Sequence, residues 1–390
     1  MRLHVLSEAV LGTERPLTLI PGTLLAALIA GASFLLAESL GAGLARVLQL
    51  EHSPVSTFLL AIVLGMAVKN VVPLPSGFEA GLRFCLAKVL RAGIVLLGIR
   101  LSIVAVMRIG VVAALIVIVC VVTAILLTAL FARWFGVSDR LGTLIAAGTS
   151  ICGVSAVVAV SPAIGALEEE TSYAISTVTI FGVVATLLYP YLAELGFGLS
   201  VGQAGLFLGT AVHDTSQVTG AAFIYDQLWA REVSRIAITT KLVRNALMVA
   251  VIPLLSVAFA RRAAASGAGP GEGGARPSVW KVFPVFVLGF VALAVFRSVG
   301  DAMVAGDAGR FLFWSGADSW SGFHEEVKQV ASYLLSLAIA AAGLSTDVAK
   351  LKRLSLRPFL VGLVAAVAVG VVSLLLVSGL GGVIAAQIGG

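Results

Sequence analysis

A succession of long apolar segments is the feature that most limits how this chain can fold. A helix of about 20 apolar residues spans the hydrocarbon core of a bilayer. Only 12% of the 390 residues are charged, against about 25% in soluble domains, so the chain has too little polar surface for a water-soluble protein. We therefore predict an all-α polytopic protein that forms a single integral membrane domain over residues 1–390 and binds no nucleic acid.

Nine apolar segments are predicted to cross the membrane completely, and two more are interrupted. The interrupted segments, 140–166 and 201–227, each carry a polar, glycine-containing stretch at their centre, so the prediction is 9–11 spans in all. A stretch rich in Gly makes 261–279 a flexible linker on the cytoplasmic side. The complete crossings are predicted at 17–38, 55–72, 79–105, 108–132, 172–194, 232–260, 280–299, 325–346 and 356–379.

The basic residues of two loops predict the orientation of the chain. The loops after residues 260 and 346 each carry four Lys or Arg side chains, and loops rich in Lys and Arg stay on the cytoplasmic side. Counting crossings from these two loops puts the N-terminus in the cytoplasm and the C-terminus outside the membrane.

An internal repeat relates the two interrupted segments. The residues from Gly148 (Gly-Thr-Ser-Ile-Cys-Gly-Val-Ser) match those from Gly209 (Gly-Thr-Ala-Val-His-Asp-Thr-Ser) at an offset of 61 residues. Broken segments at equivalent positions of two repeats are a sequence signature of a transporter's substrate site. The alternative is that these small polar residues only let helices pack closely.

The direction of the two repeats depends on how the interrupted segments are arranged. If each is a re-entrant hairpin, the two enter the membrane from opposite sides and the repeats are inverted. We favour this arrangement over two unwound helices that cross the membrane. The repeat assigns 79–194 to a first core, 201–260 and 325–379 to a second core, and 17–72 with 280–299 to a scaffold.

Charged side chains at membrane depth are candidates for function, because each costs about 3 kcal/mol or more there. Arg91 lies about 18 Å into its predicted crossing at 1.5 Å per residue, three residues after Lys88. Lys241 and Arg244 lie near the middle of another crossing. Asp214 can neutralise one of these four cations, so the surplus positive charge favours an anionic ligand. The alternative is that the cations bond backbone carbonyls or face a wet cavity.

The predicted solute site combines these cations with the polar residues of both interruptions. His213 and Asp214 are predicted to carry a coupling proton or to help bind Na⁺, with a purely hydrogen-bonding role as the alternative for His213. No catalytic residue, resident metal or other cofactor is predicted. The solute-binding residues are predicted to be Arg91, Lys241, Arg244, Asn245, Gly148, Thr149, Ser150, Cys152, Gly153, Ser155, Gly209, Thr210, Thr215, Ser216 and Gln217, with Lys88 as an additional cation.

These motifs resemble the YeiH-type sulfate exporter family. The resemblance rests on 148–156, 161–166, 213–218, 241–245 and 88–98, and it covers about residues 50 to 379. It implies a bacterial inner-membrane protein related to the cation–proton antiporter and anion transporter superfamily, with inverted repeats, discontinuous helices and elevator-type movement. The resemblance strengthens the prediction of the fold more than that of the solute.

Together these features predict a secondary transporter that exports a small anion, such as sulfate or a sulfonate, by alternating access. The expected partners are this anionic solute and the lipid bilayer, and a homodimer is left open. An anion channel is the first alternative, although channels favour symmetric rings of charge. The second alternative is an intramembrane enzyme with Ser150 or Cys152 as nucleophile and His213 as base, but Gly148 to Gly153 lacks the Gly-x-Ser-x-Gly spacing.

Overall fold

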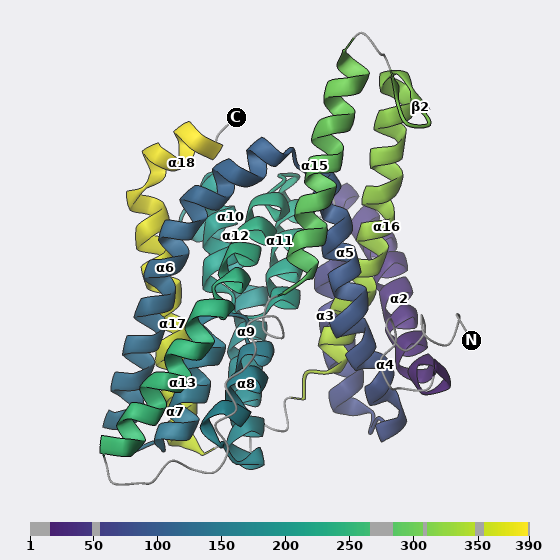
Figure 1. Ribbon diagram of the computed structural model, residues 1–390. Coiled ribbons are helices and arrows are strands. Elements are labelled where there is room, and N and C mark those ends of the chain that lie inside the picture. The colour runs from purple at the N-terminus through teal and green to yellow at the C-terminus, as the bar shows by residue number, and fades with distance from the viewer. Residues whose placement is uncertain (1–15, 49–54, 266–283, 307–309, 348–354, 389–390) are drawn as a thin grey trace, which may run out of the picture. The chain divides into compact units, whose positions relative to one another are not determined.

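The computed structural model is almost entirely helical (Figure 1). It describes residues 16–48, 55–265, 284–306, 310–347 and 355–388. The chain packs into two compact units. Unit 1 comprises Met1–Ser102, Asp226–Ala230 and Gly289–Asp347, and unit 2 comprises Ile103–Tyr225, Arg231–Leu288 and Val348–Gly390.

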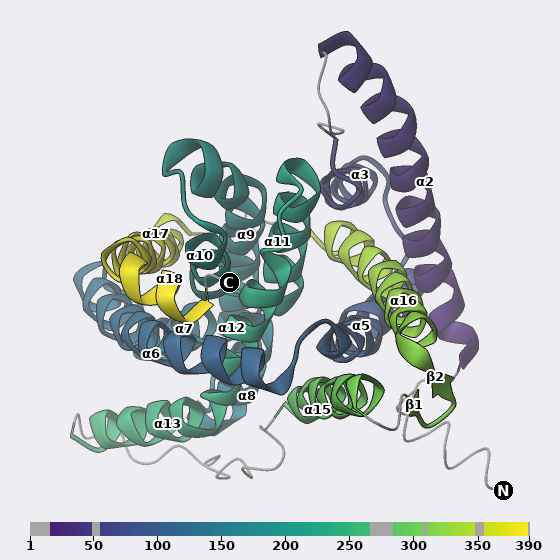
Figure 2. The same cartoon turned by 90° about the horizontal axis from the view of Figure 1, so that it is seen from above.

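Unit 1 is built around α16, which contacts α2, α3 and α5 (Figure 2). It also holds the last turn of α11, where Gln227 Oε1 accepts a 2.7 Å hydrogen bond from Ser56 Oγ. Its helices are α2 (Pro16–Leu48), α3 (Thr57–Val71), η1 (Ser76–Phe78), α4 (Glu79–Phe84), η2 (Cys85–Val89), α5 (Leu90–Leu97), η3 (Gly98–Arg100), most of α15 (Phe286–Ala305) and α16 (Gly316–Leu344).

Glycines let the helices of unit 1 pack backbone against backbone. A Cβ added to Gly22 in α2 would lie 2.1 Å from Phe78 O, next to α4. A Cβ added to Gly343 in α16 would lie 2.4 Å from Ile62 O of α3. Because no larger side chain fits at these crossings, the glycines fix which helices of the unit are neighbours.

A short antiparallel hairpin joins α15 to α16 in the otherwise helical fold. In it, β1 (Arg310–Phe311) pairs with β2 (Trp314–Ser315). Trp320 of α16 packs edge-on against Phe311 and donates a 2.8 Å hydrogen bond to Asp301 Oδ1 in α15. The hairpin therefore ends in an aromatic cluster that holds α15 and α16 together.

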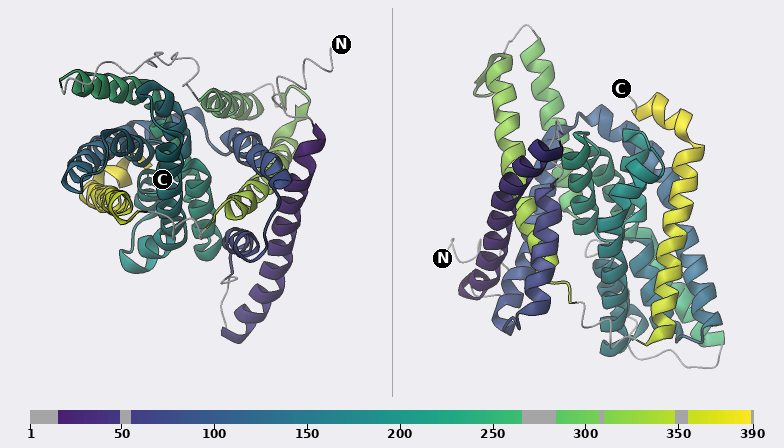
Figure 3. Two further views of the ribbon diagram at one scale, coloured as in Figure 1. Left: turned by 90° about the horizontal axis from the view of Figure 1, so that it is seen from below. Right: turned by 180° about the vertical axis from the view of Figure 1, so that it is seen from behind.

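Unit 2 contains both interrupted segments. Within it, α6 lies beside α17 in the views of Figures 2 and 3, and α10 packs on α12. Its helices are α6 (Ile103–Trp134), α7 (Asp139–Ser150), α8 (Val154–Val160), η4 (Ser161–Ile164), α9 (Glu168–Tyr191), η5 (Leu192–Gly196), α10 (Val201–Ala211), α11 (Thr215–Trp229, to Tyr225), α12 (Ser234–Ala246), α13 (Met248–Ala265), α17 (Leu356–Gly379) and α18 (Gly381–Ile388).

Both interrupted segments are broken helices. The first break, residues 151–153, separates α7 from α8, and the second, residues 212–214, separates α10 from α11. The two breaks lie 61 residues apart, at the offset that the repeat predicts. Gly153 turns the chain with φ of +71°, a conformation that favours glycine.

Each broken helix returns to the end of unit 2 from which it starts. At the first one, Ser138 Oγ just before α7 donates a 2.7 Å hydrogen bond to Glu170 Oε1 in the first turn of α9, the next long helix after α8. At the second one, Arg231 Nη1 just after α11 lies 2.9 Å from Glu194 Oε2 in η5, which precedes α10. Figure 1 shows α7 and α8 in the lower part of the unit and α10 and α11 in the upper part. This arrangement agrees with two re-entrant hairpins rather than two crossing helices.

Six helices of the described residues are long and apolar enough to cross a membrane, or up to seven if one bent pair is a single span. The bent pair is α12 with α13, which meet at 42°. The prediction of nine complete crossings was therefore too high. The segment 55–72 forms only the 15-residue α3, and 79–105 is interrupted by a π-helical turn and ends as a helix at Arg100.

Several sequence predictions remain open. The helix α13 continues to Ala265, so the predicted linker 261–279 begins inside a helix, and its residues 266–279 lie outside the described ranges. Most of the loop cations that predict the orientation also lie outside those ranges. The core and scaffold ranges remain a prediction about movement, although the packing places 79–102 and 316–344 in unit 1, with the predicted scaffold helices.

Candidate functional site

Two cations of α12 are buried where the two breaks of unit 2 meet. The side chains of Lys241 and Arg244 belong to residues with 0% exposure. Lys241 Nζ donates 3.0 Å hydrogen bonds to Ile151 O of the first break and to Val212 O of the second. It also donates to His213 O. A single ammonium therefore joins both breaks.

Arg244 joins the same two regions one turn further along α12. Its Nε donates to Ser150 O at 2.9 Å, and its Nη1 donates to Thr210 O at 2.6 Å and to Val212 O at 3.2 Å. Its Nη2 donates to Thr149 O. These carbonyls belong to the C-terminal ends of α7 and α10, which lack intrahelical partners and carry partial negative charge. The guanidinium satisfies both helix ends at once.

The acceptors of the two cations are related by the internal repeat. Lys241 bonds Ile151 O and Val212 O, which are 61 residues apart, and Arg244 bonds Thr149 O and Thr210 O, which have the same offset. Each cation thus bridges equivalent oxygens of the two repeats. This agrees with the lack of Lys and Arg in α9, the helix of the first repeat that corresponds to α12.

The helix α9 takes the place of α12 in the first repeat. It holds its neighbours by close packing instead of by cations. A Cβ on Gly148 would lie 2.7 Å from Val178 Cγ2, and one on Gly182 would lie 1.9 Å from Gln217 Oε1. At the corresponding place in the second repeat, a Cβ on Gly209 would lie 2.6 Å from Thr240 Cβ. The matching glycines therefore position each broken helix against its neighbour.

The hydrogen bonds of Lys241 and Arg244 go to backbone carbonyls, and their predicted contact with an anion stays a prediction. An ammonium has three N–H donors, and all three of Lys241 point to backbone carbonyls. Arg244 also directs its donors to carbonyls. The structure thus has the arrangement that the sequence left open as an alternative, in which the cations compensate the backbone.

Asp214 caps α11 at the second break. Its Oδ1 accepts hydrogen bonds from Ser216 N at 2.8 Å and from Ser216 Oγ at 2.6 Å. Its Oδ2 lies 3.2 Å from the position of a Cβ on Gly153, so the two breaks touch directly. A carboxylate at a helix N-terminus is favourable, and the cap accounts for one of its oxygens.

Two polar side chains beside the cations have unpartnered atoms. His213 and Asn245 are 1% and 2% exposed, and both ring nitrogens of His213 and Oδ1 of Asn245 have no hydrogen-bond partner among the described residues. Asn245 Nδ2 donates to Thr215 Oγ1 at 3.1 Å. A buried polar atom without a partner costs about 1–3 kcal/mol. These atoms are therefore the part of the cluster best suited to receive a ligand.

The predicted hydroxyl groups are mostly engaged in local bonds. Thr149 Oγ1 donates to Ile145 O at 2.8 Å, and Ser150 Oγ donates to Ala147 O at 3.3 Å. The structure also adds a residue that the sequence did not suggest, because Ser373 Oγ of α17 lies 2.6 Å from Thr210 Oγ1. The signal available in the sequence was only a lone Ser in an apolar helix.

The remaining predicted residues of the breaks occupy different surroundings. Gln217 is held by Thr179 O, to which its Nε2 donates at 3.0 Å. Ser155 is exposed. Cys152 Sγ lies 3.2 Å from Met248 Sδ. Because both ring nitrogens of His213 lack a partner among the described residues, neither Cys152 nor Ser150 is hydrogen bonded to that ring. Among the described residues, no group of three or more His, Cys, Asp or Glu could hold a metal ion.

Arg91 and Lys88 do not join this cluster within unit 2. Both belong to unit 1, where Lys88 lies in the π-helical turn η2 and Arg91 lies near the start of α5. Both are exposed in the structure. Their predicted contact with the solute stays a prediction.

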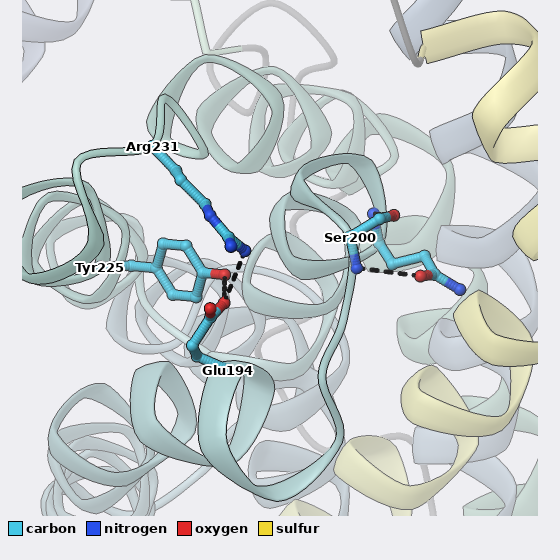
Figure 4. A network of polar contacts seen from close by, with 5 residues as sticks. Glu194, Ser200, Tyr225 and Arg231 are labelled. Carbon is cyan, nitrogen blue, oxygen red and sulfur yellow. Dashed lines mark hydrogen bonds and ion pairs between the residues drawn. The ribbon is translucent and has the colours of Figure 1, made fainter.

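A second polar network joins the two ends of the second broken helix, away from its break (Figure 4). Tyr225 OH and Arg231 Nη1 both donate to Glu194 Oε2. Nearby, Ser200 N donates to Gln203 Oε1 at 3.1 Å as α10 begins. This network was not predicted from the sequence, although a Glu at the end of an apolar segment was a signal for it.

Comparisons with known proteins find bacterial membrane proteins that are similar to this chain. The family model described as Conserved hypothetical protein 698 matches residues 21–362. A UPF0324 membrane protein of Streptococcus pneumoniae is 30% identical over 311 residues, which are 79% of this chain and 85% of the relative. A UPF0324 membrane protein of Bacillus cereus is 30% identical over 326 residues, 83% of each chain. One of Ralstonia nicotianae is 31% identical over 330 residues, 80% of this chain and 84% of the relative. No solved structure matches the chain.

Proposed function

The chain belongs to the Conserved hypothetical protein 698 family of UPF0324 membrane proteins, and we propose that this multi-pass protein is a secondary transporter that exports a small anion. Sulfate or a sulfonate is the proposed solute, as for the YeiH-type sulfate exporters that its motifs resemble. The bacterial inner membrane is the proposed location, with the N-terminus in the cytoplasm and the C-terminus outside.

One observation carries the proposal, namely the charge and the unpartnered groups where the two breaks meet. Lys241 and Arg244 are fully buried, and Asp214 is the carboxylate beside them, so positive charge is in excess there. His213 and Asn245 add buried polar atoms without partners. Paired broken helices at equivalent positions of two repeats are typical of solute sites in secondary transporters.

The proposed anion is bound by neutral donors and attracted by the buried cations. An N–H of the His213 ring and the second N–H of Asn245 Nδ2 can donate to an oxyanion. Lys241 and Arg244 act mainly through their charge, because all three N–H donors of Lys241 and four of the five of Arg244 are bonded to carbonyls. Unit 2 holds both breaks and both cations, so we propose that it carries the solute while unit 1 serves as the scaffold.

Transport of radiolabelled sulfate into proteoliposomes preloaded with unlabelled sulfate tests the proposal. We expect uptake that saturates and is inhibited by sulfite or by sulfonates. His213→Ala should raise the half-saturating sulfate concentration about tenfold, equivalent to about 1.4 kcal/mol of binding energy. Arg235→Ala removes an exposed cation of the same helix that pairs with Glu232, so it is the matched control and should transport like the wild type.

Two results would reject the proposal. Flux that rises linearly with sulfate and gives single-channel currents would favour an anion channel. Equal transport by His213→Ala, Asn245→Ala and the wild type would show that the unpartnered groups are not the site. Hydrolysis of a sulfate ester that is lost in Ser150→Ala, with transport retained, would instead favour an enzyme.

A further inference from the structure

We propose that the carbonyl oxygens of the two breaks form a site for a monovalent cation, and that Lys241 fills this site with its own ammonium group. This inference concerns how the breaks are held together and does not depend on which solute is carried. It implies that the breaks need no dissolved Na⁺ or K⁺ to assemble.

The geometry of the oxygens is that of a cation site. The ammonium of Lys241 is surrounded by Ile151 O and Val212 O, each at 3.0 Å, and by His213 O. Backbone carbonyls are the groups that replace the hydration shell of a monovalent cation in selective channels. Ile151 and Val212 come from equivalent positions of the two repeats, so the oxygens approach from two chain segments of opposite hairpins.

Burial makes a positive charge necessary at this point. Lys241 is fully buried, and the breaks follow directly on the C-terminal ends of α7 and α10. Those ends carry partial negative charge, and buried carbonyls without donors are destabilising. Removing the ammonium therefore leaves three oxygens that can be satisfied by another cation of similar size.

The neighbouring Arg244 provides an internal comparison. Its planar guanidinium reaches four carbonyls, of which Thr149 O and Thr210 O are equivalent in the repeat. A planar fork and a compact ammonium need differently shaped surroundings. The two positions should therefore accept different small cations when their side chains are removed.

Thermal unfolding of the purified full chain tests the inference by chemical rescue. Lys241→Ala removes three methylene groups and the ammonium, which together correspond to propylammonium. In choline chloride, we expect this variant to unfold on the order of 5 °C below the wild type. Propylammonium chloride should restore at least half of that loss, whereas propanol, which is of similar shape but uncharged, should not.

Arg244→Ala is the matched control for specificity. Guanidinium at low, non-denaturing concentration should raise the unfolding temperature of Arg244→Ala but not that of Lys241→Ala, and propylammonium should show the opposite preference. The wild type should unfold at the same temperature in sodium, potassium and choline chloride. If Lys241→Ala is obtained only when propylammonium is present during purification, that result also supports the site.

Several outcomes would overturn the inference. They are a Lys241→Ala variant as stable in choline chloride as the wild type, equal rescue by propanol, or a wild type that needs Na⁺ or K⁺ for its stability. If Lys241→Ala yields no folded protein under any condition, Lys241→Met tests the inference instead, because methionine fills the space without a charge. A Met variant as stable as the wild type would contradict the site, and a strongly destabilised one would support it.

Discussion

At the scale of single residues, the cations of α12 stabilise helix ends that would otherwise face each other with the same partial charge. The C-terminal ends of α7 and α10 both point their carbonyls toward Lys241 and Arg244. Two like helix ends repel each other, and a cation between them reverses that interaction. The side chains are thus needed for the meeting of the hairpins before any solute is bound.

Arg244→Lys is the substitution that tests this role at the level of geometry. A lysine ammonium has three donors in a compact group and cannot reproduce the fork that bonds four carbonyls. We expect the variant to lose about 1–3 kcal/mol of stability, because at least one buried carbonyl is left without a donor. Thermal or denaturant unfolding measures the loss.

The matched control for this substitution is Arg235→Lys, on the exposed face of the same helix. Exposed substitutions usually change stability by no more than about 0.5 kcal/mol. An Arg244→Lys variant that unfolds with the Arg235→Lys variant and the wild type would contradict the structural role.

At the scale of elements, the two broken helices behave as hairpins that are closed at their outer ends and joined at their breaks. The first is closed by the hydrogen bond from Ser138 to Glu170, and the second by the bonds of Tyr225 and Arg231 to Glu194. The charges are placed where each hairpin begins and ends. Polar pairs exposed to solvent contribute about 0.2–1 kcal/mol each, which slightly favours the folded-back arrangement over an extended one.

Accessibility labelling distinguishes hairpins from crossing helices. Arg140→Cys and Glu169→Cys place a thiol at exposed positions in the first turn of α7 and in the first turn of α9. The native cysteines Cys85, Cys120 and Cys152 are buried, so they give little background. A membrane-impermeant thiol reagent should label both introduced cysteines from the same side. Labelling from opposite sides would show that the segment crosses the membrane.

The sequence predicted where the two breaks lie but not which atoms contact one another there. The match between Gly148 and Gly209 located both breaks correctly, because a repeat preserves backbone irregularities. The positions of Lys241 and Arg244 were also correct, but their partners are carbonyls, and a sequence contains no information on where an unwound backbone points its oxygens. Arg91 was grouped with Lys241 and Arg244 because of its predicted depth in the membrane alone. It lies in unit 1, whose helices pack against one another through glycines.

At the scale of the whole molecule, the two breaks and the long helices around α16 belong to different compact units. Unit 2 contains both breaks with the cations between them, and unit 1 contains α2, α3, α5 and α16. The number of crossings was overestimated because hydropathy does not reveal that a helix is short or interrupted, as at 57–71 and 79–100. A transporter of the proposed kind needs one rigid body that carries the solute, and the shared cations make the two hairpins of unit 2 one body.

Equilibrium binding of radiolabelled sulfate to the purified protein, with sodium chloride or choline chloride as the background salt, is the decisive measurement for the proposed anion site. We expect saturable binding that is unchanged when choline replaces sodium, is weakened about tenfold or more in His213→Ala, and is retained in Arg235→Ala. Binding that is absent for sulfate, sulfite and sulfonates alike, or that requires Na⁺, would show that the proposed site is wrong.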